Sequence, residues 1–326
     1  MRNLIAILFL SGLLAGPVSA TPGQDFSKVV APSACMACHQ REAKVWQNTK
    51  HNALFKKFHK RKNGKKIAKR LGIKRIKRAP LCLSCHYTAN ERKRIVAGVS
   101  CESCHNPAQD WMGVHNLFGG NGTKAGESAG QKAKRIRIAE KAGMAHPSNI
   151  YNVAKNCFTC HSIQEEKLVE VGGHKQGWAF ELVTFTQGEV RHNFVNNKHH
   201  SNKEASPARK RQMYIVGRLL DLEMGLRGVA KVTARSKYAV KLAKRTKKAL
   251  GHIKLILAAA PKSSSLSTAY QIGRKVQLRP NNSAKLIAAA EKIAKINIRI
   301  SKGQTKSNYP QIDKLIPKLY KGTTSR

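Results

Sequence analysis

The last third of the chain shows the clearest pattern of apolar and polar positions. Apolar residues recur at helical spacing in three segments, residues 211–232, 238–260 and 283–300. Ser206 and Pro207 have the form of a helix N-cap and a first helical residue, which places the first helix start there. One face of the last segment collects five apolar residues, Leu286, Ala289, Ala290, Ile293 and Ile300. The pattern predicts a helical bundle over residues 207–326.

The remainder of the chain shows no strong alternation of the kind that predicts β-strands. Its start has the form of an export signal: a basic Met1-Arg2-Asn3, an apolar run over 4–16 that is too short to span a bilayer, and a small-x-Ala cleavage site at Val18-Ser19-Ala20. We therefore expect residues 1–20 to be a cleaved signal peptide and the mature protein to begin near Thr21, in the periplasm. A membrane anchor is the alternative.

The eight cysteines form four pairs, with two residues between the partners and a His directly after each pair. The pairs are Cys35/Cys38, Cys82/Cys85, Cys101/Cys104 and Cys157/Cys160, followed by His39, His86, His105 and His161. Cys-x-x-Cys-His is the attachment pattern of c-type haem. Two thiols add to the porphyrin vinyl groups, and the next residue presents an imidazole to the iron. The pattern predicts four covalent haem c groups with these histidines as proximal ligands.

Competing interpretations of the cysteines fit less well. A thioredoxin-like dithiol needs one pair and no following His. A zinc ribbon explains paired cysteines but not a His after every pair. All four sites fall between Cys35 and His161, so little chain is available per haem, and the porphyrins are expected to pack against one another. The second and third sites, only 19 residues apart from Cys82 to Cys101, are expected to be neighbours.

The sixth iron ligand decides between an electron carrier and an enzyme. Nine further histidines are available, and local context selects four as candidate distal ligands: His51, His115, His174 and His192. A predicted helix should carry His51 from the first site to a different iron. Glycines before His174 allow a close backbone approach. His146 is a reserve choice, and Met112 and Met144 remain open alternatives.

Charge adds a prediction about partners. The chain has 61 Lys and Arg against 17 Asp and Glu, a net charge of +44. Such an excess first suggests nucleic acid, but an exported protein does not meet the genome. Haem propionates reduce the charge and leave a strongly cationic surface. Residues 56–78 contain no acid, and we expect them to dock redox partners with acidic faces, or the chain to associate with an anionic membrane surface.

Residues 33–194 resemble the tetrahaem cytochrome family typified by cytochrome c-554. The resemblance lies in CMACHQREAKVWQNTKH at the first site, GVSCESCHNPAQDWMGVH at the third and CFTCH at the fourth. It implies that His51, twelve residues after the first proximal His, and His115, ten after the third, are axial ligands. It also implies a mostly helical fold with closely stacked haems, of which the one at the second site can lack a sixth ligand. The surroundings of the fourth site depart from the family pattern.

Together these patterns predict a mostly α protein with stacked haems. Its expected regions are a signal peptide at 1–20, a tetrahaem domain at 21–200 and a haem-free helical region at 207–326. The favoured function is electron transfer between redox partners in the periplasm. The alternative is a multihaem reductase that acts on a small nitrogen or sulfur oxide at an open haem, which needs an unliganded iron and acid-base groups beside it.

Overall fold

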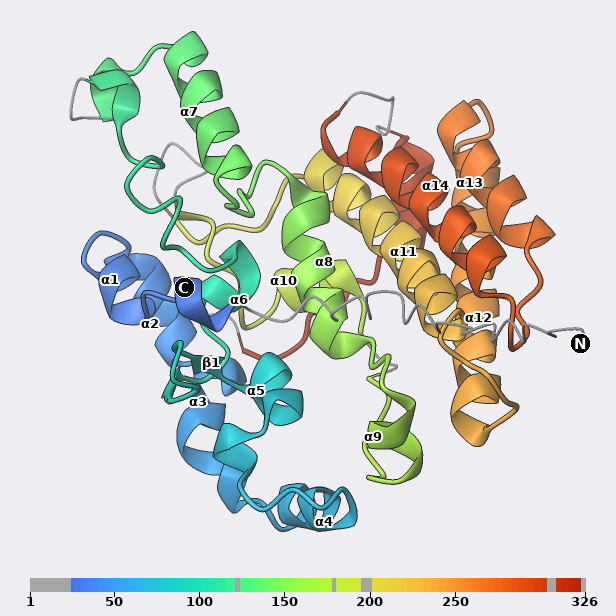
Figure 1. Ribbon diagram of the computed structural model, residues 1–326. Coiled ribbons are helices and arrows are strands. Elements are labelled where there is room, and N and C mark those ends of the chain that lie inside the picture. Colours follow the sequence, from blue (N-terminus) through green and yellow to red (C-terminus); the bar gives the residue numbers. More distant parts are fainter. Residues whose placement is uncertain (1–24, 121–123, 178–179, 195–200, 304–308, 324–326) are drawn as a thin grey trace, which may run out of the picture.

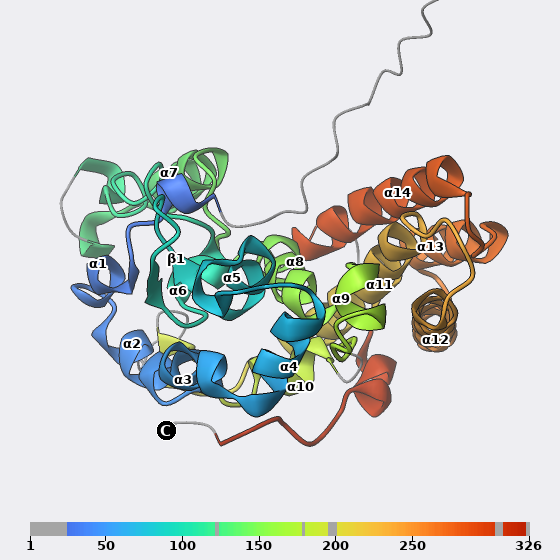
Figure 2. The same cartoon turned by 60° about the horizontal axis from the view of Figure 1, so that its bottom comes forward.

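The computed structural model describes residues 25–120, 124–177, 180–194, 201–303 and 309–323. The predicted signal peptide therefore lies outside the described residues, as do His199 and His200. The described chain is mostly helical and forms two regions on either side of one helix, α8 (Ile150–His161), as Figures 1 and 2 show. Among the described residues, no helix is long and apolar enough to cross a membrane.

Short elements build the region before α8. Its helical elements are η1 (Phe26–Lys28), α1 (Pro32–Met36), α2 (Gln40–Gln47), α3 (Lys50–Lys57), η2 (Phe58–Lys60), α4 (Lys62–Arg70), η3 (Ile76–Arg78), α5 (Pro80–His86), α6 (Cys101–His105), η4 (Phe118–Gly120), η5 (Lys124–Gly126) and α7 (Ala129–Lys141). Two short strands, β1 (Thr88–Ala89) and β2 (Ile95–Ala97), pair antiparallel.

Long helices build the region after α8. The elements that follow it are α9 (Glu166–Glu170), α10 (Leu182–Thr186), α11 (Pro207–Val229), α12 (Lys237–Ala259), α13 (Ser264–Lys275), α14 (Ser283–Ser301) and η7 (Pro310–Leu315). In Figure 1, α11 lies between α8 and the outer helices α12–α14. Helix α11 is buried over most of its length, because α8, α10, α12 and α14 all pack against it.

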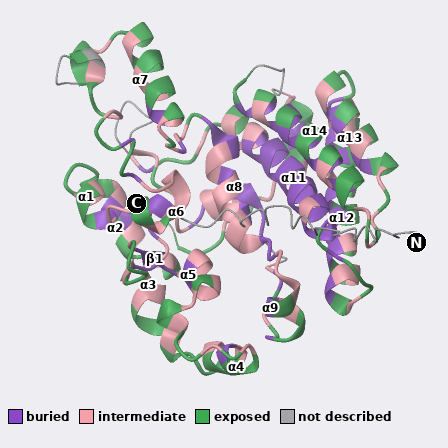
Figure 3. Cartoon of the chain, in the orientation of Figure 1, coloured by how far each residue is buried: buried purple, intermediate pink, exposed green. Residues whose placement is uncertain are grey.

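The two regions differ sharply in their buried apolar residues. One large cluster extends from Ile150 on α8 to Ile312 in η7 and includes the inner faces of α11, α12 and α14. The region before α8 has a small cluster of three buried residues, Leu83, Tyr87 and Ala89. Figure 3 shows the same contrast, with buried positions concentrated on α11 and α14 and intermediate or exposed positions over α1–α7.

The predicted C-terminal helices are confirmed. Helix α11 begins at Pro207, and the Ser206 hydroxyl accepts a hydrogen bond from the Arg209 backbone N–H, as an N-cap does. Helices α12 and α14 match the predicted 238–260 and 283–300, and the five apolar residues of the last segment are all buried. The mostly α fold is confirmed as well. The domain limits at 200 and 207 remain a prediction, and the apolar cluster of the bundle reaches back across them to α8.

Two features differ from the predicted helices. The single helix expected between the first site and His51 is divided into α2 and α3, because the Thr49 hydroxyl accepts a hydrogen bond from the Asn52 backbone N–H and caps a new helix. Helix α13 was not predicted. Its buried face consists of Leu266, Ala269 and Gly273, and such small residues give a weak apolar signal.

Candidate haem-binding site

Each Cys-x-x-Cys-His sequence occupies a helical turn. In α5, α6 and α8 the histidine is the last residue of the helix. At the first site α1 ends at Met36, and the His39 backbone N–H still donates to the Cys35 carbonyl at 2.9 Å. The first Cys and the His are four residues apart and so lie on the same face of the turn. All eight cysteines are free thiols, which leaves them available for attachment.

The four proximal histidines each lie opposite one of the four predicted distal histidines. The ring centres are separated by 6.3 Å for His39 and His115, 6.1 Å for His86 and His174, 6.3 Å for His105 and His192, and 6.3 Å for His161 and His51. Every pair joins segments that are distant in sequence. His51 faces His161 of the fourth site rather than His39, from which its own segment departs.

This separation suits a metal ion held between two imidazoles. Two rings that bind one ion from opposite sides, each through a nitrogen about 2.0 Å from the metal, have centres roughly 6 Å apart. No group of three or more His, Cys, Asp or Glu side chains in the described part of the chain could hold a metal ion. A structural zinc site needs four protein ligands, whereas a haem iron needs at most two because the porphyrin supplies the others. The residues present therefore fit haem.

Hydrogen bonds fix the orientation of several of these rings. The Nδ1 atoms of His105, His115, His174 and His192 donate to backbone carbonyls at distances of 2.6–3.0 Å. A metal-binding histidine commonly donates its second ring nitrogen in this way, which directs the first nitrogen toward the metal. Because the Met112 carbonyl is the acceptor for His115, that methionine supports the histidine through its backbone.

Burial keeps most of the proximal imidazoles neutral. It lowers the pKa of His86, His105 and His161 to about 4, and the facing histidine acts in the same direction in each case. His39 differs, because a hydrogen bond to Glu42 raises its pKa. Neutral imidazole is the form that binds a metal, so the environment of the second, third and fourth sites favours the binding form.

The thiols show which sites are neighbours. Cys35 of the first site and Cys101 of the third are in hydrogen-bond contact, and so are Cys85 of the second and Cys160 of the fourth. Cys104 of the third site interacts electrostatically with Cys157 of the fourth. The sites therefore follow one another in space in the order first, third, fourth, second. A cavity of about 110 Å³ is bordered by residues of the last three, including Cys85, Ser103 and Cys160.

The neighbourhood of His174 explains its two preceding glycines. A side chain on Gly172 would approach the Leu168 carbonyl to 2.5 Å and Leu71, next to α4, to 3.1 Å. Gly173 has a φ of 73°, and a Cβ there would lie 2.5 Å from Arg70 Nη1. Only glycine accommodates both this conformation and this contact. The loop can thus bring His174 close to α4 and α5, opposite His86.

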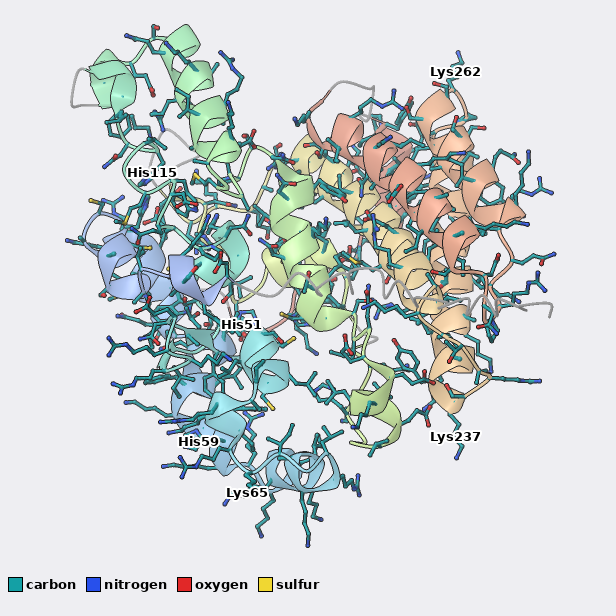
Figure 4. All side chains as sticks on the ribbon, viewed as in Figure 1. His51, His59, Lys65, His115, Lys237 and Lys262 are labelled. Atoms are coloured by element: carbon teal, nitrogen blue, oxygen red, sulfur yellow. The ribbon has the colours of Figure 1, made fainter. Side chains whose placement is uncertain are left out.

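The other described histidines, including the reserve choice His146, lie elsewhere. His59 lies 3.3 Å from the Tyr87 hydroxyl, and the reserve choice His146 lies 2.7 Å from the Ser148 hydroxyl. His252 lies on α12, in the bundle. Figure 4 shows His51 and His115 on the side where the attachment helices gather, and His59 beside the basic segment that includes Lys65.

Sequence reasoning missed Glu102, which lies inside the third attachment loop. Its side chain is buried, with 1% exposed, and accepts hydrogen bonds from the backbone N–H groups of Val30, Ala31 and Ala108 at 2.9–3.0 Å. The carboxylate thereby joins the segment before the first site to the third. The sequence offered one signal for this role, which is an acidic residue between two haem cysteines in a chain with only 17 Asp and Glu.

The basic segment 56–78 is exposed at every Lys and Arg. It folds as the end of α3 followed by η2, α4 and η3, and both α3 and η3 pack against α5 of the second site. Phe58 stacks on His86 with ring centres 3.8 Å apart. The positive surface therefore lies next to the second site, at one end of the series. Cys38 of the first site, at the other end, is exposed.

Comparisons with known proteins agree with this geometry. Residues 34–106 match the family described as cytochrome c554 and c-prime. The chain is similar to cytochrome c-554 of Nitrosomonas europaea, with 29% identity over 171 residues, which covers 48% of this chain and 68% of that protein. No solved structure matches. These similarities, together with the four Cys-x-x-Cys-His turns, indicate a c-type cytochrome with covalently bound haem c and a role in electron transfer. Within that class, they support a cytochrome c-554-like family.

Proposed function

We propose that this protein is an exported electron carrier with four haem c groups, each held between two histidines. The observation that supports this most directly is the placement of four imidazoles opposite the four proximal ones, at ring-centre distances of 6.1–6.3 Å. Haem iron, when bound, supplies a reversible one-electron change, and its potential depends on its axial ligands and surroundings. An iron with two histidine ligands has no open position for a substrate.

The proposed ligand pairs are His39 with His115, His86 with His174, His105 with His192, and His161 with His51. The proximal residue comes from the attachment turn and the distal one from a remote segment. Each pair would therefore join two parts of the chain through one iron. The second site, which can lack a sixth ligand in the family resembled, has His174 available here.

The contacts among thiols support an electron path through the first, third, fourth and second sites. Its two ends differ in their surroundings. The end at the first site has the exposed Cys38, and the end at the second lies beside the exposed lysines and arginines of 56–78. We propose that redox partners with acidic faces dock at the second end, because opposite charge accelerates encounter. An anionic membrane surface is the other partner that this charge would attract.

The reductase alternative receives less support. It requires an iron with one protein ligand, and all four proximal histidines have a second imidazole opposite. The larger cavity, of about 630 Å³, lies between α9 and α12 and is lined by residues such as Glu165, Glu170 and Tyr238. None of the eight paired histidines is among its lining residues. The cavity is therefore not placed to bring a substrate to an iron.

The periplasmic location rests on the export signal of residues 1–20, since c-type cytochromes acquire haem after export. The test of the proposed function is the intact mass of the purified protein together with its low-temperature spin-resonance spectrum. We expect the Thr21–Arg326 polypeptide plus four haem masses, and four low-spin irons. Fewer haems would refute the tetrahaem assignment. Four haems with one high-spin iron would favour the reductase instead.

A further inference from the structure

A buried ion pair connects the haem-free helices to the fourth site. Arg245 on α12 has 6% of its surface exposed and Asp221 on α11 has 9%. The Arg245 Nε and Nη2 atoms lie 2.7 Å and 2.6 Å from Asp221 Oδ1. The guanidinium is thus oriented by a carboxylate from the neighbouring helix. Both residues belong to the region of the chain that contains no cysteine.

The opposite side of the same guanidinium faces the attachment turn. Arg245 Nη1 donates to the carbonyl of His161, 3.4 Å away, and to the carbonyl of Gly177, 3.5 Å away. His161 is the last residue of α8, and a cation at a helix C-terminus is electrostatically favourable. Gly177 has a φ of 69°, and a Cβ there would lie 2.4 Å from the His161 oxygen. The absence of a Cβ at residue 177 therefore allows this loop to lie against the His161 carbonyl.

The stability of the bundle does not account for such a pair. Taking two charges out of water is costly, and well-packed apolar residues in place of a buried ion pair often leave stability unchanged or improve it. The surrounding cluster is large and apolar, so an aliphatic pair would suit the bundle at least as well. What an aliphatic pair cannot supply is a fixed positive charge beside His161.

We propose that Arg245 is a positioning residue for His161 and raises the reduction potential of the haem at the fourth site. This rests on the proposed function, in which Cys157 and Cys160 carry a haem and His161 binds its iron. Oxidised haem has one more positive charge than reduced haem. A buried cation nearby disfavours the oxidised form, and the low dielectric of the interior strengthens the effect. The haem-free helices would then influence the electron path, and the fourth site is internal to that path.

A second buried arginine of the bundle provides a matched control. Arg211 on α11 donates from Nη1 to both carboxylate oxygens of Asp313, at 3.0 Å and 2.8 Å. It is 7% exposed, nearly the same as Arg245, and its ion-pair partner comes from η7 at the far end of the chain. Replacing Arg211 removes a guanidinium of similar burial and its ion pair, whose carboxylate is more exposed than that of Asp221, without removing a charge beside His161.

The experiment is a potentiometric titration of the complete holoprotein, with the haems resolved by their spin-resonance and haem-methyl NMR signals. We expect Arg245→Gln to shift one haem to a more negative potential and Asp221→Asn to shift the same haem to a more positive one. The other haems should move much less. The double variant Arg245→Met/Asp221→Leu leaves no unpaired buried charge and should still shift that haem negatively. Arg211→Gln should lower the unfolding midpoint and leave the potentials unchanged.

The intact mass separates failure of this inference from failure of the proposed function. A wild-type protein with only three haems, none attached at Cys157 and Cys160, would overturn both. Four low-spin haems whose potentials are the same in the wild type, Arg245→Gln and the double variant would overturn this inference alone. So would an equal shift of all four haems, or the same shift in Arg211→Gln, because either would indicate a general loosening of the protein.

Discussion

The regions before and after α8 differ in the side chains that hold each of them together. The helices after α8 bury a large continuous apolar cluster, whereas the cluster found among the described residues before α8 is small and consists of Leu83, Tyr87 and Ala89. In place of apolar residues the region before α8 contains six of the eight free thiols and five of the eight paired imidazoles. A chain this poor in apolar core needs another source of stability, and covalent porphyrins with iron-ligand bonds can provide it. We therefore expect haem to contribute most to the stability of the region before α8 and least to that of helices α11–α14.

The largest expected effect is that of haem removal. In protein produced without haem attachment, residues 26–149 should lose most of their hydrogen-exchange protection, because their contacts are few without the porphyrins. Helices α11 and α14 should remain protected, since their buried residues pack on one another. Hydrogen exchange followed by mass spectrometry measures both regions in one sample. Equal loss of protection in the two regions would contradict the comparison.

A core substitution in α11 tests whether the C-terminal helices can be destabilised without a change in haem binding. Leu220 on α11 is fully buried, and Leu220→Ala should lower the free energy of unfolding by about 2–5 kcal/mol through lost burial and a cavity. Haem content and spin state should not change. Leu255 on α12 is 53% exposed, and Leu255→Ala should change the free energy of unfolding by less than about 0.5 kcal/mol. Denaturant titrations of the three proteins give these values, and loss of haem from the Leu220 variant would mean that the regions are not separate.

Sequence and structure agree most where the chemistry is local. The Cys-x-x-Cys-His turns, the N-cap at Ser206 and the apolar face of α14 all depend on residues within one or two helical turns, and sequence spacing displays them directly. The order of the sites depends on contacts such as Cys85 with Cys160, which are 75 residues apart and have no sequence signal. The pairing of His51 with the distant His161 likewise depends on a contact that sequence spacing does not display.

Charged residues were the hardest to interpret. Arg245 belongs to an α12 segment with many exposed basic residues, and nothing in the sequence distinguishes it from its neighbours. Its burial follows from the position of α12 against α11, where Asp221 is available. The division between α2 and α3 was missed for a related reason. Helical periodicity continues across the break, and a single threonine hydroxyl decides where the second helix starts.

Glu102 tests how the haem-binding region is held together apart from haem. Glu102→Gln keeps the shape but removes the charge that three backbone N–H groups contact, and should lower the free energy of unfolding by about 1–3 kcal/mol. Glu91 is exposed, and Glu91→Gln should have an effect below about 0.5 kcal/mol. Thermal unfolding followed by haem absorbance compares the two variants. An equal effect would show that the Glu102 contacts add nothing to stability.

The smallest expected effect on the protein itself is that of reversing surface charge. Reversal at Lys65, Lys66, Lys69, Lys74 and Arg75 should leave haem content and potentials nearly unchanged. It should slow electron transfer with an acidic partner and flatten the salt dependence of the rate, because charge acts on encounter and is screened within about 10 Å at 0.1 M salt. The matched control reverses five exposed lysines of α12: Lys241, Lys244, Lys247, Lys248 and Lys254.

Stopped-flow rates at several salt concentrations distinguish the two surfaces. The α12 variant should keep the larger part of the wild-type rate and salt slope, since its five lysines lie on a helix without a haem-attachment sequence. Equal rates and slopes for all three proteins would remove the partner-docking role from residues 56–78. Binding of the wild type to anionic vesicles, lost in the 56–78 variant, would assign that surface to membrane contact instead.

The central claim is that each iron lies between two histidines from distant parts of the chain. Spin-resonance spectra of His51→Ala and His115→Ala, with His146→Ala as control, test it most directly. Each of the first two variants should convert one haem from low to high spin while the intact mass still shows four haems, because attachment depends on the cysteines and the proximal histidine. His146→Ala should keep four low-spin haems, since that side chain faces Ser148. Unchanged spectra for His51→Ala and His115→Ala would contradict the claim.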